Sequence, residues 1–184
     1  MENTPNRIYT ADEFFEMIPE TNKQYELHEG EILALASPSV MHQRLSRKLV
    51  AKLDSFISSK GGSCEPFNAP LDVKLDDHNV VQPDVFVVCD RDKIGNKRIN
   101  GAPDFVIEVM SDNRSIDLVT KLSLYMRFGV REYWIADLKN RKVLVYRFEE
   151  SDILEILGFD ESIPVGIFGG ELSIQISGLV DGDL

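Results

Sequence analysis

The chain has 184 residues, of which 43% are hydrophobic and 28% charged, and these proportions are ordinary for a globular protein with one real core. We therefore expect a single domain over residues 1–184. The formal net charge of −11 argues against indiscriminate binding to nucleic acid. No apolar stretch approaches the ~18 residues of a membrane helix, and no signal peptide is apparent at the start of the chain, so we expect a cytoplasmic protein without a membrane partner.

The first half of the chain is predicted to contain a helix, a hairpin and a longer helix. Thr10-Ala11-Asp12-Glu13 has the pattern of a capping box, which favours a short helix through Ile18. Two strands over 25–27 and 31–35 flank a turn that contains Gly30. Apolar residues that recur at three- and four-residue steps predict a helix over 39–59: Leu45, Leu49, Leu53, Phe56 and Ile57.

The second half reads as strands interrupted by one helix. Residues 71–75 alternate as in a strand, residues 76–79 turn, and Val85 to Val88 return as the next strand. A strand over 106–110 precedes a helix over 115–128, which Gly129 ends. Further strands are predicted at 132–136, 143–146, 153–157 and 172–176. The pattern predicts an α/β fold with a central mixed sheet flanked by helices.

The two cysteines, Cys64 and Cys89, are expected to be reduced thiols. They have no CxxC spacing, and the chain offers no further cysteine as a partner. Cytoplasmic proteins rarely carry disulfides, so reduced cysteines agree with the expected location.

Two acidic residues stand inside or beside apolar strands. Asp84 opens Asp84-Val85-Phe86-Val87-Val88, and Glu108 lies within Phe105-Val106-Ile107-Glu108-Val109. An ionised carboxylate in a dry interior is costly, so such a residue is protonated, paired with a cation or bound to a metal. We expect the pair to share a divalent ion, and hard oxygen ligands favour Mg²⁺ or Mn²⁺. The alternatives are a turn position for Asp84 and a solvated strand edge for Glu108.

Three further residues qualify as members of such a site. Lys121 lies at the apolar margin of its predicted helix, beside Tyr125, where it could orient a water, although a surface ion pair with Asp117 is the simpler reading. Glu26 could point inward from its strand as a helper acid, or be solvated. His42 falls on the apolar face of the long helix, as a core histidine or as an accessory group of the site.

A basic face on the long helix moderates the acidity of the whole chain. Arg44, Lys48 and Lys52 are candidates for contact with a phosphate backbone, and a merely solvated face is the alternative.

An ordered set of motifs resembles a known family. These motifs are Tyr25-Glu26-Leu27-His28-Glu29-Gly30-Glu31, Ser37-Pro38-Ser39 with His42, Ala69-Pro70-Leu71-Asp72-Val73, Gln82-Pro83-Asp84, Gly101 to Val109, and Lys121 with Tyr125 followed by Gly129 to Ile135. Over roughly residues 8–150 the chain resembles the restriction endonuclease family of Uma-two type, within the PD-(D/E)xK nuclease superfamily.

The resemblance implies a restriction-endonuclease-like core and a metal-dependent endonuclease acting on DNA. It implies that Glu26, Asp84, Glu108 and Lys121 are catalytic, and that Asp84, Glu108 and Val109 bind Mg²⁺ or Mn²⁺. The superfamily's lysine belongs two residues after the glutamate, where this chain has Met110, so the resemblance transfers that role to Lys121. A homodimer is expected from restriction-like nucleases, and no small-molecule cofactor.

Two other functions stay open on the sequence alone. One is a non-catalytic interaction module that keeps the nuclease fold, which the net charge of −11 and Met110 favour. The other is an RNA-processing nuclease that uses the same residues.

Overall fold

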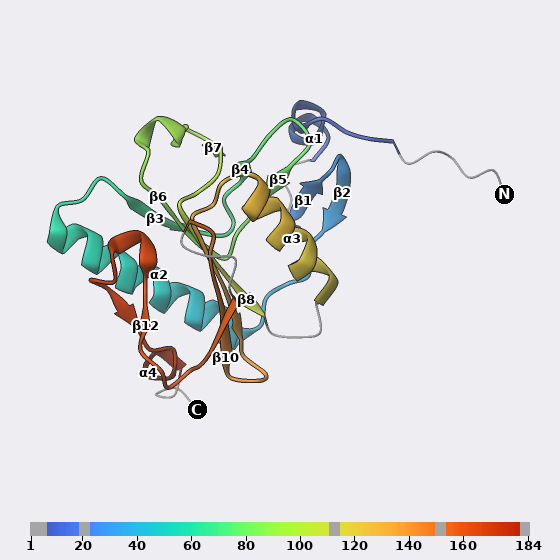
Figure 1. Cartoon of the computed structure of the whole chain (residues 1–184). Helices are drawn as coiled ribbons and strands as arrows, with labels where there is room; N and C mark the ends of the chain where they lie inside the picture. Colours follow the sequence, from blue (N-terminus) through green and yellow to red (C-terminus); the bar gives the residue numbers. More distant parts are fainter. Residues whose placement is uncertain (1–6, 19–22, 111–114, 150–153, 181–184) are drawn as a thin grey trace.

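The central sheet of the molecule has six strands in the order β11-β10-β9-β8-β6-β3 and is built around one parallel pair (Figure 1). The structure is a computed structural model that describes residues 7–18, 23–110, 115–149 and 154–180, with the side chains of 115–119 left aside. The parallel strands β8 (Phe105–Met110) and β9 (Glu132–Asp137) are joined through α3 (Ser115–Arg127).

The remaining strands of this sheet pair antiparallel with their neighbours, so the sheet is mixed, as the sequence predicts. They are β3 (Glu65–Asn68), β6 (Val85–Val88), β10 (Lys142–Arg147) and β11 (Leu154–Gly158).

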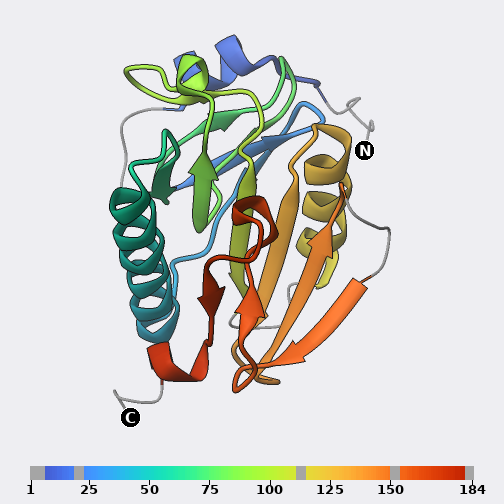
Figure 2. The same cartoon turned by 60° about the vertical axis from the view of Figure 1, so that its left-hand side comes forward.

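The two long helices lie on opposite faces of this sheet, as Figure 2 shows. Because successive strand residues point to opposite faces, each strand serves both cores. In β8, Phe105 and Ile107 join the buried cluster of α2 (Val40–Lys60), whereas Val106 joins the cluster of α3. Glu108 follows the alternation of Val106, so its side chain is directed toward α3.

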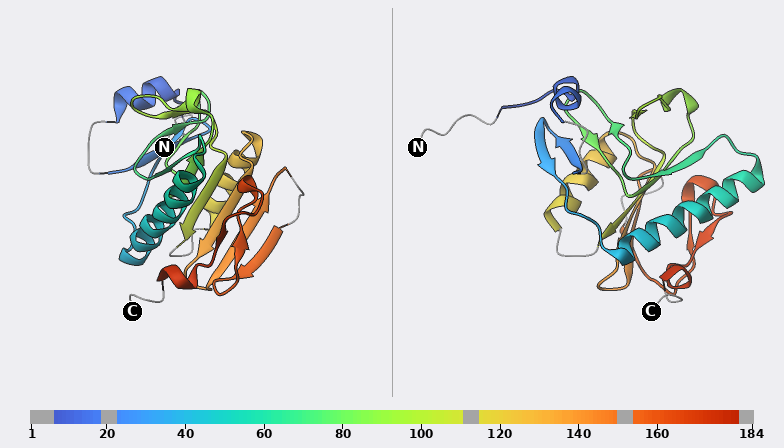
Figure 3. Two further views of the ribbon diagram at one scale, coloured as in Figure 1. Left: turned by 90° about the vertical axis from the view of Figure 1, so that its left-hand side faces the viewer. Right: turned by 180° about the vertical axis from the view of Figure 1, so that it is seen from behind.

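A second sheet of five strands, in the order β2-β1-β5-β4-β7, lies beside the first with α1 (Ala11–Met17) packed on it (Figure 3). Its strands are β1 (Tyr25–His28), β2 (Glu31–Ala34), β4 (Val73–Lys74), β5 (Val80–Val81) and β7 (Ile99–Asn100).

The C-terminal segment completes the core on the face covered by α2. It contains a two-stranded sheet whose residues Ile163 and Ile174 are fully buried with the α2 leucines. Its elements are β12 (Ile163–Pro164), η2 (Gly166–Phe168), β13 (Ser173–Ile174) and α4 (Ser177–Val180).

The predicted helix ends agree with the structure because local chemistry sets them. The Thr10 hydroxyl accepts from the Glu13 N–H and the Glu13 carboxylate accepts from the Thr10 N–H, which is the predicted capping box of α1. Ser39 caps the start of α2, and Gly61, at φ 64°, ends it in the left-handed conformation. No helix among the described ranges is long and apolar enough to cross a membrane.

The strand pairing between residues 64 and 88 differs from the prediction. Strand β3 was not predicted, and proline at its second position obscures the pattern because proline cannot donate to a ladder. The strand that returns beside β4 is β5, whereas Val85–Val88 belongs to the other sheet, between β3 and β8. A short 3₁₀ helix, η1 (Arg91–Lys93), follows β6.

The prediction of reduced cysteines is wrong, because the structure joins Cys64 and Cys89 in a disulfide. The cause is the missed strand. Strands β3 and β6 pair antiparallel with Glu65 opposite Val88, so the next pair along is Cys64 opposite Cys89. Residues separated by 25 positions in the chain thus become cross-strand neighbours.

The packing of α2 on the central sheet predicts a strong effect of one truncation. Leu49 is fully buried between α2 and the sheet, so Leu49→Ala should lower the free energy of unfolding by about 2–5 kcal/mol. Val40, on the same helix, is 70% exposed, and Val40→Ala should change the free energy of unfolding by no more than about 0.5 kcal/mol. Urea denaturation followed by circular dichroism measures both, and equal values would contradict the assigned packing.

Candidate active site

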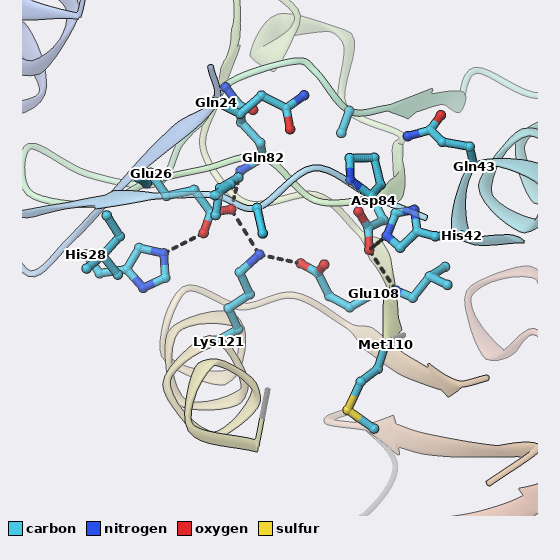
Figure 4. A pocket seen from close by; sticks show the side chains of 17 residues that line it. Gln24, Glu26, His28, His42, Gln43, Gln82, Asp84, Glu108, Met110 and Lys121 are labelled. Carbon is cyan, nitrogen blue, oxygen red and sulfur yellow. Dashed lines mark hydrogen bonds and ion pairs between the residues drawn. The ribbon is translucent and has the colours of Figure 1, made fainter. Parts of the chain in front are cut away.

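Strand register brings the two acids of the central sheet together. Strands β6 and β8 pair antiparallel with Val85 opposite Ile107, so the next pair along is Asp84 opposite Glu108. Both acids line a cavity of about 230 Å³ bounded by β1, the β2–α2 connection, the start of α2, β8 and α3 (Figure 4). The predicted neighbourhood of Asp84 and Glu108 is therefore present.

Asp84 is held by groups from two elements. Its Oδ2 accepts a hydrogen bond from the Val109 N–H at 2.7 Å and lies 2.9 Å from Nε2 of His42. His42 is itself fixed in the first turn of α2, where its N–H donates to the Ser39 hydroxyl and its carbonyl accepts from Ser46. The carboxylate of Asp84 is thus oriented from both sides, with 17% of its side chain exposed.

Glu108 is held from α3 by two residues one helical turn apart. Its Oε1 accepts hydrogen bonds from Nζ of Lys121 at 3.0 Å and from the Tyr125 hydroxyl at 2.8 Å. Burial raises the pKa of Glu108 to about 8, and the negative charges of Asp84 and Glu26 act in the same direction, against the ammonium of Lys121. Burial, with the neighbouring carboxylates, also raises the pKa of Tyr125, so its hydroxyl remains a hydrogen-bond donor.

Glu26 is the most deeply buried acid of the group, with 1% of its surface exposed. Its Oε1 lies 2.9 Å from Nζ of Lys121 and accepts from the Gln82 N–H at 2.8 Å, and its Oε2 lies 2.8 Å from Nε2 of His28. Burial alone would raise the pKa of Glu26, but these donors, Lys121 first among them, lower it to about 2. Glu26 is therefore an ionised carboxylate in the folded protein.

Lys121 is shared between the acids of both sheets. It is 8% exposed, and its Nζ contacts Glu26 of the five-stranded sheet and Glu108 of the six-stranded sheet. Burial opposes the ammonium, but the carboxylates outweigh burial and raise its pKa, so Lys121 stays charged. The side chain of Asp117, the alternative partner, lies outside the described residues.

Met110 occupies the position at which the superfamily's lysine is expected. It lines the same cavity, as do Lys121, Glu26, His28 and His42. Because position 110 carries no ammonium, Glu108 receives one from the following helix, where Lys121 contacts it.

The basic residues of α2 do not enter this cavity. Arg44 lines a neighbouring hollow instead, and Lys48 and Lys52 lie further along the helix. Gln82, which the sequence marks only as part of the Gln82-Pro83-Asp84 motif, is a further member of the site, because its N–H donates to Glu26 and the residue lines the cavity. Its position two residues before Asp84 is the only hint in the sequence, because the contact of this segment with Glu26 of β1 depends on the fold.

The comparisons with known proteins bear on the family and the fold of the chain. A solved structure described as a putative nuclease belonging to DUF820 from Anabaena variabilis ATCC 29413 matches with a TM-score of 0.78 and 26% identity, covering 94% of this chain and 97% of that one. No curated protein matches the chain. The model of the Uma2 family, described as "Putative restriction endonuclease", matches residues 11–177. The chain therefore belongs to the Uma2 family of restriction endonuclease-like proteins.

Proposed function

We propose that this protein is a nuclease that hydrolyses phosphodiester bonds of DNA with the help of Mg²⁺ or Mn²⁺. The observation that carries the proposal is the ammonium of Lys121, held at 2.9 Å from Glu26 and 3.0 Å from Glu108 on the floor of an open cavity that Asp84 also lines. Family membership supports the nuclease class. The metal, the substrate and the roles of the residues are our inference.

The donor set of the cavity fits a hard divalent cation. When ionised, Glu26, Asp84 and Glu108 carry three negative charges and Lys121 one positive charge, which leaves an excess of two negative charges among the described residues that line it. No group of three or more His, Cys, Asp or Glu residues converges as a ready-made metal site within the described part of the chain. Mg²⁺ is commonly bound by only one or two protein carboxylates, with water and substrate oxygens as its other ligands.

The contacts made among the described residues leave specific atoms for that cation. Asp84 uses Oδ2 toward His42 and Val109, and Glu108 uses Oε1 toward Lys121 and Tyr125. Oδ1 of Asp84 and Oε2 of Glu108 are then the oxygens from which a cation would be bound. Because the N–H of Val109 holds Asp84, any contribution of Val109 would come from its carbonyl oxygen.

In this scheme the residues of the chain divide the work. A bound Mg²⁺ supplies polarisation of the scissile phosphate and a lower pKa for the attacking water. Lys121 orients that water by hydrogen bonding and offsets the negative charge that develops on the phosphate oxygens. Glu26 and Tyr125 keep the ammonium and Glu108 in place. His42 holds the carboxylate of Asp84 in the orientation that faces the cavity.

Loss of the metal-binding acids should abolish cleavage. With Mg²⁺ and a mixture of supercoiled, linear duplex and single-stranded DNA, we expect Asp84→Asn and Glu108→Gln to reduce the cleavage rate by at least about 100-fold, because each removes a ligand to the cation. Lys121→Met should lower kcat by about 10²–10³-fold, as expected for loss of one preorganised donor.

The matched control is Glu16→Gln, which removes an exposed carboxylate of α1 and should leave the rate unchanged. Titration calorimetry with Mg²⁺ and Mn²⁺ supplies a second readout. Absence of both cleavage and metal binding in the wild type would favour the interaction module. Cleavage of RNA in preference to DNA would favour the RNA-processing nuclease.

The raised pKa of Glu108 predicts a specific pH dependence of stability without metal. The folded protein holds the proton of Glu108 up to about pH 8, whereas the unfolded chain releases it near its ordinary value of 4.5. The folded state thus binds more protons in this window, so the free energy of unfolding should fall as pH rises from about 5 to 8.

The measurement is urea denaturation in EDTA across this pH range for the wild type and Glu108→Gln. The variant keeps an acceptor for Tyr125 but has no carboxyl group to titrate at this position. As pH rises from about 5 to 8, the free energy of unfolding of the wild type should therefore fall relative to that of the variant. Parallel profiles would contradict the raised pKa.

A further inference from the structure

The catalytic cavity opens beside a second hollow on the surface of α2. This hollow, of about 340 Å³, is lined by Pro38, Ser39, Val40, Gln43, Arg44 and Arg47. Pro38 and Gln43 line both spaces, so the two adjoin at the start of α2. In Figure 4, Gln43 lies next to His42 at the edge of the catalytic cavity, which marks the point of junction.

The chemistry of the second hollow differs from that of the first. The catalytic cavity is lined by Glu26, Asp84 and Glu108, whereas the second hollow is lined by two guanidinium groups and by no acidic residue of the described chain. It also contains Val40, which is 70% exposed although it is a large apolar residue. Such a hollow suits one nucleotide unit, whose phosphate would face the two guanidinium groups and whose sugar or base would lie against Val40.

The basic character continues along one face of α2. Arg44, Lys48 and Lys52 follow one another at four-residue steps and lie on one side of the helix, and Arg47 lies one turn after Arg44. Between residues 44 and 60 the only acidic residue is Asp54, in a chain whose net charge is −11. A run of basic residues beside the cavity, in a chain that is acidic as a whole, favours the approach of an anionic strand at this place.

We propose that the hollow lined by Arg44 and Arg47 binds the phosphate next to the one that is cut. The nucleic-acid strand would run from the catalytic cavity past Gln43 and onto α2, with Lys48 and Lys52 beneath phosphates further along. This inference rests on the proposed function and adds to it the path of the substrate.

The path also selects the form of the substrate. Glu108 is 7% exposed and Glu26 is 1% exposed, so the chemical groups lie recessed within a cavity of about 230 Å³. That volume is below the ~300–1,000 Å³ of pockets that take drug-sized ligands. A single strand can place one phosphate in this cavity and the next against Arg47, whereas the backbone of an intact duplex stays outside it. Single-stranded DNA, or duplex DNA with a frayed end, is therefore the preferred substrate.

The first test measures binding separately from cleavage. A fluorescein-labelled single strand of about 12 nucleotides is titrated with the Glu108→Gln protein, which does not consume it, and with the same protein carrying Arg47→Ala. We expect Arg47→Ala to weaken binding about fivefold to tenfold and to reduce the slope of log affinity against log salt by about 0.7, the value for one contact to a single-strand phosphate.

The matched control is Lys60→Ala on the same helix. Lys60 is exposed, lies outside both hollows and pairs with Glu171 at 2.5 Å, so its loss changes the net charge equally without touching the proposed path. Equal weakening by Arg47→Ala and Lys60→Ala would overturn the proposal, because the effect would then be one of net charge. Tighter binding of a hairpin duplex than of the single strand would overturn the preference for single strands.

The second test places the contact on one phosphate. Two substrates are made, each with a neutral methylphosphonate in place of the phosphate on one side of the scissile phosphate. Cleavage assays then give KM and kcat of the wild type and of Arg47→Ala for each substrate. At one of the two positions the analogue should raise KM for the wild type about fivefold to tenfold and have little effect on Arg47→Ala, with kcat within about twofold throughout. Additive effects at both positions would overturn the proposal.

The experiments distinguish a wrong strand-binding path from a wrong nuclease assignment. If the wild type cleaves and Arg47→Ala behaves like Lys60→Ala, the path along α2 is wrong and the nuclease stands. If binding depends on Arg47 but the wild type cleaves nothing with Mg²⁺ or Mn²⁺, the nuclease proposal is wrong and the strand-binding path stands. Thermal unfolding of each variant verifies folding, which Arg47→Ala should leave unchanged because Arg47 is exposed.

Discussion

The ammonium of Lys121 is the constraint on which the site depends. It is buried together with carboxyl groups from two different sheets, and without it Glu26 would be a buried, poorly compensated charge and Glu108 would lose a hydrogen-bond donor. Its place on α3, in the crossover between the parallel strands β8 and β9, brings it over the strand that carries Glu108. The connection between the two parallel strands thus also supplies the ammonium of the site.

The two glutamates of the site have the same side chain and opposite behaviour. Glu26 accepts from Lys121, His28 and a backbone N–H, and these donors lower its pKa to about 2. Glu108 faces α3 between apolar neighbours and two other acids, and burial raises its pKa to about 8. Environments that separate the pKa values of like groups are typical of sites that assign them different tasks. Glu26 is a permanent counter-ion, and in the proposed function Glu108 would be the group whose charge state changes when a cation binds.

The sequence predicted the parts of the fold that local chemistry determines, and it missed those that tertiary pairing determines. The capping box at Thr10 and the leucine spacing of α2 specify their helices within a few residues, so both were predicted. Strand β3 contains Pro66 and forms only through pairing with β6, and its omission also concealed the disulfide between Cys64 and Cys89.

The site was predictable to a similar extent. Acids in apolar strands are anomalies that sequence alone reveals, and the helical face of Lys121 marked it as unusual. The hydrogen bond from the Gln82 N–H to Glu26 and the contact between His42 and Asp84 depend on how separate elements approach one another, and no local pattern encodes that approach.

Met110 gives this arrangement an evolutionary consequence. Where the lysine and the glutamate occupy one strand, every substitution two residues after the glutamate removes a catalytic group. Here the ammonium beside Glu108 comes from α3, so in the proposed function the side chain at position 110 serves only as part of the cavity wall. Met110 also packs against the apolar cluster of α3, so this position would accept apolar residues of different size, and these would change the shape of the cavity wall without removing the ammonium.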